Sequence, residues 1–122
     1  IYLRSKGVLK VDMIKVDIEG GELAFLKGAA GLLSGPDAPL ILMEMALNTT
    51  KVFGYLPNDL MRFLESCNPY RFYRIDEVSR RLFPIREFRP DDIGANVLCV
   101  PQAKDHLLGR IDSRIATQDS WT

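Results

Sequence analysis

The sequence predicts an α/β fold built around one parallel strand–helix–strand unit. Residues 13–18 carry β-branched residues at every second position and stop at acidic residues beside a glycine pair. A helical repeat of apolar residues follows, and residues 39–43 form a second apolar run. Together these segments have the length of a βαβ unit, roughly 30 residues. The crossover of such a unit is right-handed, which makes its two strands parallel.

The first strand and the helix after it are justified by their spacing. Ile14, Val16 and Ile18 alternate along a short inner strand. The pair Gly20 and Gly21 then lets the backbone turn tightly. A helix is predicted because apolar residues recur at intervals of three and four, and it ends at Ser34, Gly35 and Pro36. Its apolar face consists of Leu23, Leu26, Ala30 and Leu33.

The remaining elements follow from shorter patterns. Residues 39–43 form an inner strand that ends in Glu44, and a loop runs from residue 48 to about residue 56. A second amphipathic helix begins near Pro57 and ends before Pro69. Strands are predicted at 70–75 and 95–100, with no helix between them, so they should form an antiparallel pair at the sheet's edge. Residues 80–89 are polar and basic and receive no element. Residues 102–122 are predicted to be a short helix and a loose tail.

Composition excludes several classes of function. The chain has 122 residues, the size of one domain, with 16 basic and 16 acidic residues and no net charge. No electrostatic footprint for nucleic acid follows, and no apolar run has the length of a transmembrane segment or a signal peptide. Cys67 and Cys99 lack metal or redox spacing, which predicts buried free thiols in a reducing compartment, the cytoplasm. The first residue is Ile1, so the chain is interpreted as a piece of a longer protein.

Three carboxylates are the candidate site residues. Asp17 and Glu19 follow the first strand and Glu44 follows the second, so all three are expected at the edge where parallel strands end. Carboxylates there can hold a cation, accept a substrate proton or bind a hydroxyl. The alternative is that Asp17 and Glu19 cap the following helix. The presence of Glu44 on the neighbouring strand favours the functional interpretation.

Other polar residues have simpler explanations. Glu22 is interpreted as a charge at the start of a helix, where the helix dipole favours it. Lys15 interrupts an apolar strand and is expected to pair with a carboxylate. His106, the only histidine, is expected to be solvated. The sequence contains no G-x-G-x-x-G turn, no phosphate loop, no Cys/His cluster and no serine flanked by glycines.

A known family shares these motifs. Residues 11–22 (VDMIKVDIEGGE), followed by Leu-Lys-Gly-Ala at 26–29, resemble the hallmark segment of FkbM-type methyltransferases. Residues 39–44 resemble the strand that follows it there, and residues 96–101 resemble the family's closing strand. The Lys-x-Asp-x-Glu-Gly-x-Glu pattern is fairly specific when it is joined to the leucine-lysine-glycine helix. The resemblance extends over residues 11 to 101, most of the chain.

This resemblance implies a Rossmann-like methyltransferase that uses S-adenosylmethionine to methylate a hydroxyl on a small molecule or glycan. The sheet of that fold has seven strands, the last two forming an antiparallel hairpin. Residues 1–101 would be the C-terminal portion, with the fourth to seventh strands. By resemblance, Asp17 is expected to orient or deprotonate the acceptor hydroxyl, with or without a divalent cation. Glu19 and Glu44 line the same edge, and Asp17 and Gly20 contact the cofactor.

The sequence departs from the family in lacking its first three strands, with their Gly-rich turn and the acidic residue that binds the ribose. Residues 1–122 alone are therefore expected neither to bind the cofactor well nor to methylate. Two alternatives stay open. One is a different Rossmann-like transferase that acts on a nucleotide-sugar. The other is a non-catalytic interaction module, a truncated α/β scaffold that pairs through the open edge of residues 13–18, the fourth strand of the methyltransferase sheet.

Overall fold

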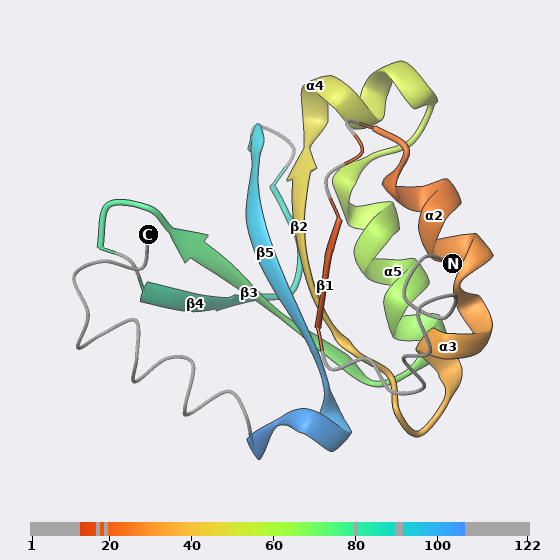
Figure 1. Cartoon of the computed structure of the whole chain (residues 1–122). Coiled ribbons are helices and arrows are strands. Elements are labelled where there is room, and N and C mark those ends of the chain that lie inside the picture. The colour runs from red at the N-terminus through yellow and green to blue at the C-terminus, as the bar shows by residue number, and fades with distance from the viewer. Residues whose placement is uncertain (1–12, 17, 19, 80, 90–91, 107–122) are drawn as a thin grey trace.

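A computed structural model of the chain describes residues 13–16, 18, 20–79, 81–89 and 92–106. Within them a sheet of five strands has the order β1-β2-β5-β3-β4 (Figure 1). The strands are β1 (Met13–Val16), β2 (Leu40–Ala46), β3 (Tyr70–Asp76), β4 (Arg81–Ile85) and β5 (Gly94–Pro101). The helices are α2 (Glu22–Gly28), α3 (Ala30–Ser34), α4 (Leu47–Thr50) and α5 (Pro57–Cys67), with the 3₁₀ turns η1 (Lys51–Phe53) and η2 (Gln102–Lys104).

The predicted parallel unit is confirmed. β1 pairs with β2 in parallel, and Val16 at the end of β1 lies opposite Met43. Two short helices, α2 and α3, take the place of the single helix that the apolar spacing predicts. They meet at Ala29, whose N–H still donates to the carbonyl of Phe25 at 3.1 Å, so the helical path continues across the break.

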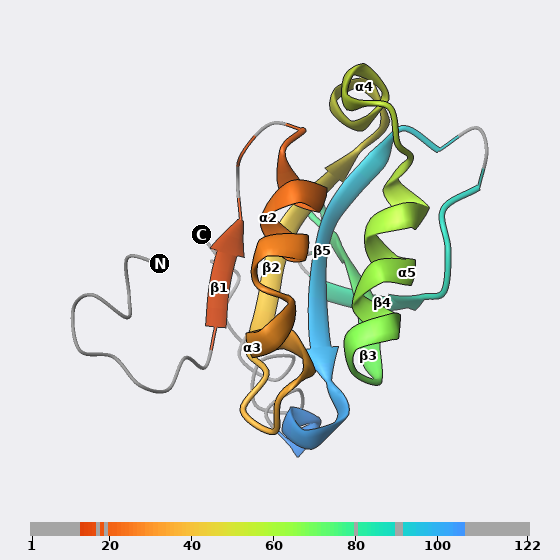
Figure 2. The same ribbon diagram turned by 90° about the vertical axis from the view of Figure 1, so that its right-hand side faces the viewer.

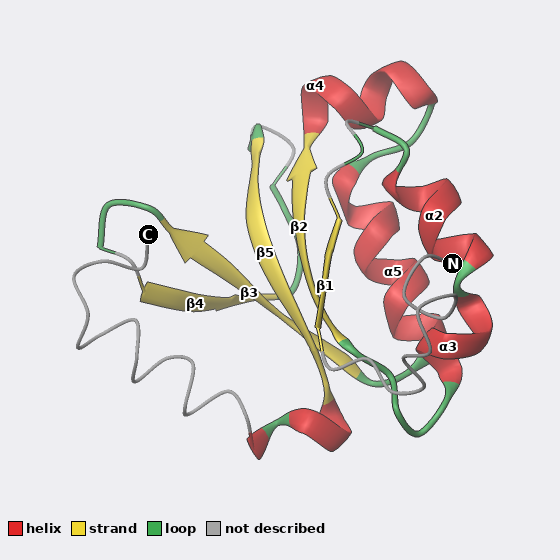
Figure 3. Cartoon of the chain, viewed as in Figure 1, coloured by secondary structure: helices red, strands yellow, loops and turns green. Residues whose placement is uncertain are grey.

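One face of the sheet carries the helices and the main core. Figures 2 and 3 show α2, α3 and α5 as one layer beside β2 and β5, while β3 and β4 curve away from that layer. Alternate residues of β2 point toward the helices, as the period of a strand requires. The most buried members of this core are Leu26, Leu33, Ile41, Met43, Met45, Leu60, Leu64, Val97 and Cys99. A smaller cluster, built on Leu40, Leu98 and Val100, lies apart from it.

The antiparallel half of the sheet corrects the predicted terminal hairpin. β3 and β5 are antiparallel neighbours as expected, but β5 lies between β2 and β3 rather than at the edge. The hairpin partner of β3 is β4, an edge strand that the sequence pattern left unassigned. β4 is mostly half-buried or exposed and contains Pro84, so no apolar alternation marks it.

Two further differences concern short elements. The segment 48–56, predicted as a loop, contains most of α4 and all of η1. The apolar residues of η1, Val52 and Phe53, are exposed and adjacent in the sequence. They therefore lack the spacing of three and four residues that predicts an amphipathic helix. After β5 the structure describes only η2 and two more residues, so the predicted tail at 107–122 lies outside the described residues.

The two cysteines are free thiols. Cys99 is fully buried, as predicted, and its burial raises the pKa of the thiol. Cys67 is only partly buried. In the portion of the chain that the structure describes, no helix has the length and apolar character needed to cross a membrane.

Candidate functional site

The structure describes one of the three predicted carboxylates, Glu44. Asp17 and Glu19 lie outside the described residues, so their roles stay predictions. Glu44 is exposed, and it lies within β2 rather than at its end because the strand continues to Ala46. The residue before it, Met43, pairs with Val16, so Glu44 lies level with the point where β1 ends. Its side chain is on the opposite face from Met43, away from the helices.

Glu22 holds the turn between β1 and α2. Its side chain is only 2% exposed although it is an acid at the start of a helix. One carboxylate oxygen accepts the N–H of Gly20 at 2.9 Å, and the other accepts the N–H of Ile18 at 3.3 Å. Gly20 is buried and has a φ of 104°, a conformation that glycine adopts without strain. Glu22 is therefore a structural residue of this turn and more than a helix-start charge.

Tyr55 reaches the same turn from the segment after η1. Its hydroxyl donates to the carbonyl of Gly20 at 2.6 Å and lies 3.3 Å from the Glu22 carboxylate. It also accepts the N–H of Leu23 at 3.4 Å. Burial, and then the nearby negative charge of Glu22, raise the pKa of Tyr55. We call Glu22 and Tyr55 the turn clamp, because together they fix the backbone that follows β1.

Removing the Tyr55 hydroxyl tests the clamp. Tyr55→Phe is expected to lower the free energy of unfolding by about 1 kcal/mol at neutral pH, since a hydrogen bond to a partly buried carbonyl is lost. The raised pKa of Tyr55 means that the hydroxyl's contribution is complete below pH ~10 and is lost as the pH rises through the folded-state pKa. Urea unfolding of both proteins at neutral and alkaline pH measures the difference, which should shrink at the higher pH. An equal midpoint at neutral pH would contradict the assignment.

An open cavity of about 1150 Å³ lies beside the end of β2, where Glu44 is exposed. It is bounded by the end of β2, the start of β5, α4 with η1, and the β3–β4 hairpin. Of the two predicted site residues that the structure describes, Gly20 and Glu44, only Glu44 lines it. The other polar and aromatic lining residues are Asn48, Lys51, Arg74, Asp76, Glu77, Phe83 and Asn96.

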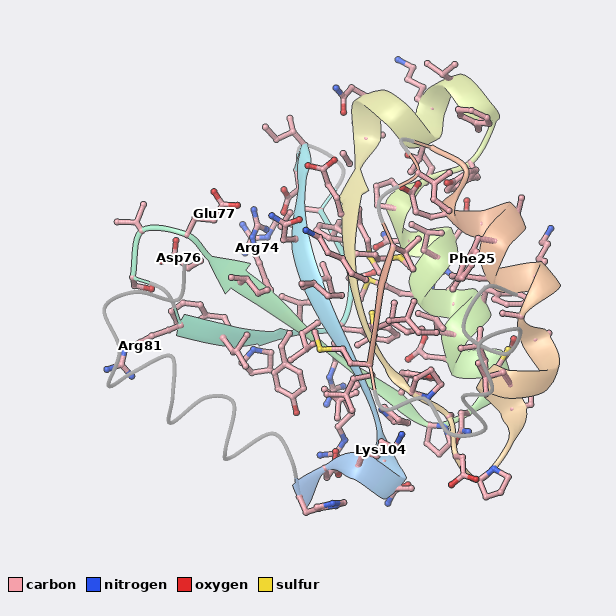
Figure 4. The ribbon with its side chains drawn as sticks, viewed as in Figure 1. Phe25, Arg74, Asp76, Glu77, Arg81 and Lys104 are labelled. Atoms are coloured by element: carbon pink, nitrogen blue, oxygen red, sulfur yellow. The ribbon has the colours of Figure 1, made fainter. Side chains whose placement is uncertain are left out.

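Side-chain contacts order two walls of the cavity. Asn96 of β5 donates from its amide nitrogen to Glu77 at 2.9 Å, which ties the hairpin to β5. The guanidinium of Arg74 pairs with Asp92 at 2.6 Å and also donates to the carbonyl of Gly94 at 3.4 Å. Figure 4 shows Arg74, Asp76 and Glu77 together where β3 ends, with Arg74 between that end and β5.

Hydrogen-bond donors lower the pKa of two carboxyl groups near this cavity, those of Asp92 and Asp76. The hydrogen bond from Arg74 is the main cause that lowers the pKa of Asp92. The Ser79 hydroxyl, which donates to Asp76 at 2.7 Å, lowers the pKa of Asp76. Both groups are therefore ionised at neutral pH. Carboxylates on a water-exposed wall can accept hydrogen bonds from ligand hydroxyls or accept a proton from one.

The described residues give no support for a metal site. No group of three or more His, Cys, Asp or Glu residues among them has the arrangement to hold a metal ion. The predicted cation at Asp17 concerns a residue outside this set. Lys15 is exposed, and its pairing with a carboxylate stays a prediction. His106 is exposed as expected.

Several site residues were missed by the sequence patterns. Tyr55 lies in a segment without a motif, 33 positions after Glu22, so nothing local signals their contact. Arg74 and Asn96 lie within the predicted strands 70–75 and 95–100, and no sequence motif marks them or Glu77 as site residues. Only the pairing of β3 with β5 and β4 brings these side chains to one cavity.

Comparison with protein families finds one match. The model of the FkbM methyltransferase domain matches residues 1–72. Searches of curated proteins and of solved structures gave no match. The matched region contains β1, the turn clamp, β2 and Glu44, so it includes the acidic edge of the parallel unit. Since it is more than half of the 122 residues, the chain belongs to the FkbM methyltransferase domain family.

Proposed function

We propose that this chain forms the acceptor-binding side of an S-adenosylmethionine-dependent O-methyltransferase that acts on a hydroxyl of a small molecule or glycan. The observation that carries the proposal is the position of Glu44. It is exposed toward a cavity of about 1150 Å³ and lies level with the end of β1, the strand before the acidic motif. Membership in a methyltransferase family favours methyl transfer over transfer from a nucleotide-sugar.

The described residues can bind and activate an alcohol. The Glu44 carboxylate accepts a hydrogen bond from a hydroxyl in the cavity, and transfer of that proton makes the alcohol oxygen a better nucleophile. Asp17 and Glu19 are proposed to act at the same edge, Asp17 by orienting the hydroxyl, with a divalent cation if one is used. Because Glu44 is already exposed, it needs no rearrangement of the core to meet a ligand.

The described residues proposed to contact S-adenosylmethionine have their polar groups bonded within the chain. Gly20, the proposed cofactor contact, has its N–H bonded to Glu22 and its carbonyl bonded to Tyr55. Glu22 itself is buried and occupied by backbone amides, so it offers no surface for ribose hydroxyls. We therefore assign no cofactor-binding step to these residues. Asp17 stays a proposed contact, and we propose that most of the cofactor site belongs to a segment outside residues 1–122.

The strand order supports this division of the domain. We propose that β1, β2, β3 and β5 are the fourth to seventh strands of the methyltransferase sheet, within a partial domain of residues 1–101, and that 102–122 are an extension. β4 is then an additional strand at the far edge. In the described part of the sheet β1 has a strand neighbour on one side only, which leaves its other edge for the missing strands.

Transfer of labelled methyl groups from S-adenosylmethionine to a panel of alcohols tests the function. The polypeptide encoded by the complete reading frame around this chain is expected to methylate a hydroxyl, and residues 1–122 alone are not. In the complete polypeptide Glu44→Gln should lower kcat by about 100-fold, the usual range for losing a general base. Glu87→Gln, at an exposed residue that does not line the cavity, should leave kcat unchanged.

Three results would contradict parts of the proposal. Tight binding of S-adenosylmethionine by residues 1–122, measured by calorimetry, would overturn the proposal that most of the cofactor site lies outside these residues. A reading frame without preceding strands, or a complete polypeptide that transfers no methyl group, would overturn the enzymatic function. A stable, specific dimer that binds no cofactor would then favour the interaction module.

A further inference from the structure

The lining of the cavity beside Glu44 has a chemistry that restricts its ligand. We infer that this cavity binds a neutral, polyhydroxylated ligand, a sugar ring, rather than an anionic or a largely apolar alcohol. That the sugar is the methyl acceptor rests on the proposed function, whereas the binding itself does not. The charges, the hydrogen-bonding groups and one aromatic ring of the cavity support the inference in turn.

The charges of the lining disfavour an anion. Glu44, Asp76 and Glu77 contribute carboxylates, while Lys51 and Arg74 contribute cations. Arg74 is already paired with Asp92 at 2.6 Å, so much of its positive charge is neutralised. The remaining field is negative, and a phosphate or carboxylate ligand would meet like charges across much of the wall.

The hydrogen-bonding groups suit a ligand with several hydroxyls. An ionised carboxylate only accepts hydrogen bonds, and its two oxygens can accept about four. Asp76 already accepts from Ser79 and from the backbone of Val78, and Glu77 accepts from Asn96, so the capacity that remains at these residues can be met by donors from a ligand or from water. The Asn96 amide is held by Glu77, which presents an amide and a carboxylate side by side. Neighbouring hydroxyls of a sugar both donate and accept, and they can satisfy such a pair. A largely apolar ligand would strip water from these groups without replacing its hydrogen bonds.

Phe83 supplies an apolar surface among these polar groups. It lines the cavity from β4 and is 47% exposed, so its side chain is accessible to a ligand in the cavity. A sugar ring has an apolar face of C–H groups that can pack on such a ring while its hydroxyls point sideways. Phe83 pairs with Arg74 in the hairpin register, so the ring is positioned beside the wall that carries Asp76 and Glu77.

Titration of the ¹⁵N-labelled chain with three probes tests the inference without any methyl transfer. The probes are methyl α-glucopyranoside, 4-methylcyclohexanol and glucose 6-phosphate, which share a six-membered ring. We expect saturable amide shifts around residues 44, 74–77 and 94–96 with the glucoside. The other two probes should bind at least about tenfold more weakly, because one lacks hydroxyl pairs and the other is an anion.

Variants at Phe83 make the test specific. Phe83→Ala and Phe83→Leu are both expected to weaken glucoside binding, the first at least about fivefold, since the stacking surface is lost. Phe53→Ala is the matched control, because Phe53 is 61% exposed and does not line the cavity. The unperturbed amide spectrum away from the cavity shows that each variant is folded.

The outcomes separate this inference from the proposed function. Absence of saturable shifts with the glucoside, equal or tighter binding of 4-methylcyclohexanol or glucose 6-phosphate, or unchanged glucoside binding by both Phe83 variants would overturn the sugar site. Methyl transfer to a non-sugar alcohol without glucoside binding would overturn it while leaving the function intact. Glucoside binding by a complete polypeptide that transfers no methyl group would support the site and remove the function.

Discussion

Gly94→Ala is expected to destabilise the protein by more than about 3 kcal/mol, the largest effect of any substitution proposed for this chain. Gly94 begins β5 with a φ of 114°, a conformation that strains any residue with a side chain. A Cβ at this position would lie 2.0 Å from the carbonyl oxygen of Met45 and 2.8 Å from the Cα of Ala46. Both obstacles are backbone atoms, so no side chain can rotate away.

The neighbouring strand cannot easily yield to the added carbon. Ala46 is the register partner of Gly94, and Met45 is fully buried against the helix layer. Moving β2 would therefore disturb the core as well as the sheet. Gly94 also donates to Asp92 at 3.1 Å and accepts from Arg74, so the substitution should loosen one wall of the cavity.

Urea unfolding followed by circular dichroism measures this effect. Gly31→Ala is the matched control, since an added Cβ there meets nothing within 4 Å and the residue lies within a helix. That substitution is expected to be neutral or to stabilise the protein by about 0.5–1 kcal/mol. An unfolding midpoint of Gly94→Ala equal to that of the parent would show that the start of β5 is far more adaptable than its contacts indicate.

Glu22→Gln is expected to have the second largest effect, a loss of about 2 kcal/mol, because hydrogen bonds to a buried charged group are replaced by poorer ones. Both carboxylate oxygens of Glu22 accept backbone N–H groups, from Gly20 and from Ile18. Glutamine has only one such oxygen, and its NH₂ group would face one of these donors. The side chain is 2% exposed, so water cannot restore the lost bond.

The same unfolding measurement tests this expectation. Glu65→Gln, at an exposed residue of α5, is the control and should change the free energy of unfolding by less than about 0.5 kcal/mol. Amide hydrogen exchange of Ile18 and Gly20 gives an independent readout, because their protection should fall in Glu22→Gln and not in the control. Unchanged protection of both amides would show that Glu22 does not hold the turn.

The two halves of the fold differ in how far the sequence reveals them. β1 and β2 are short apolar runs on either side of a helical repeat, the pattern of a βαβ unit, and they are parallel as that pattern predicts. The FkbM motif lies in this half, and the family match at residues 1–72 agrees with it. Local periodicity carries this information because each of these elements buries one apolar face.

The other half depends on contacts between distant residues. β5 lies between β2 and β3. The residues of β5 alone do not specify which strands become its neighbours. β4 has no apolar alternation because an edge strand meets water along one side, so its sequence resembles a loop. The cavity cannot be predicted from the sequence for the same reason, since its walls come from both halves.

Residue types and spacing therefore established the parallel unit, the acidic motif and the family. The placement of functional groups required the folded chain. Glu44 was identifiable from sequence because it follows an apolar run, yet its partner across the strands, Asn96, lies 52 positions later. Tyr55 and Glu22 meet only because α2 and the segment after η1 converge on one turn. Such contacts depend on the packing of whole elements, which no local pattern of residues records.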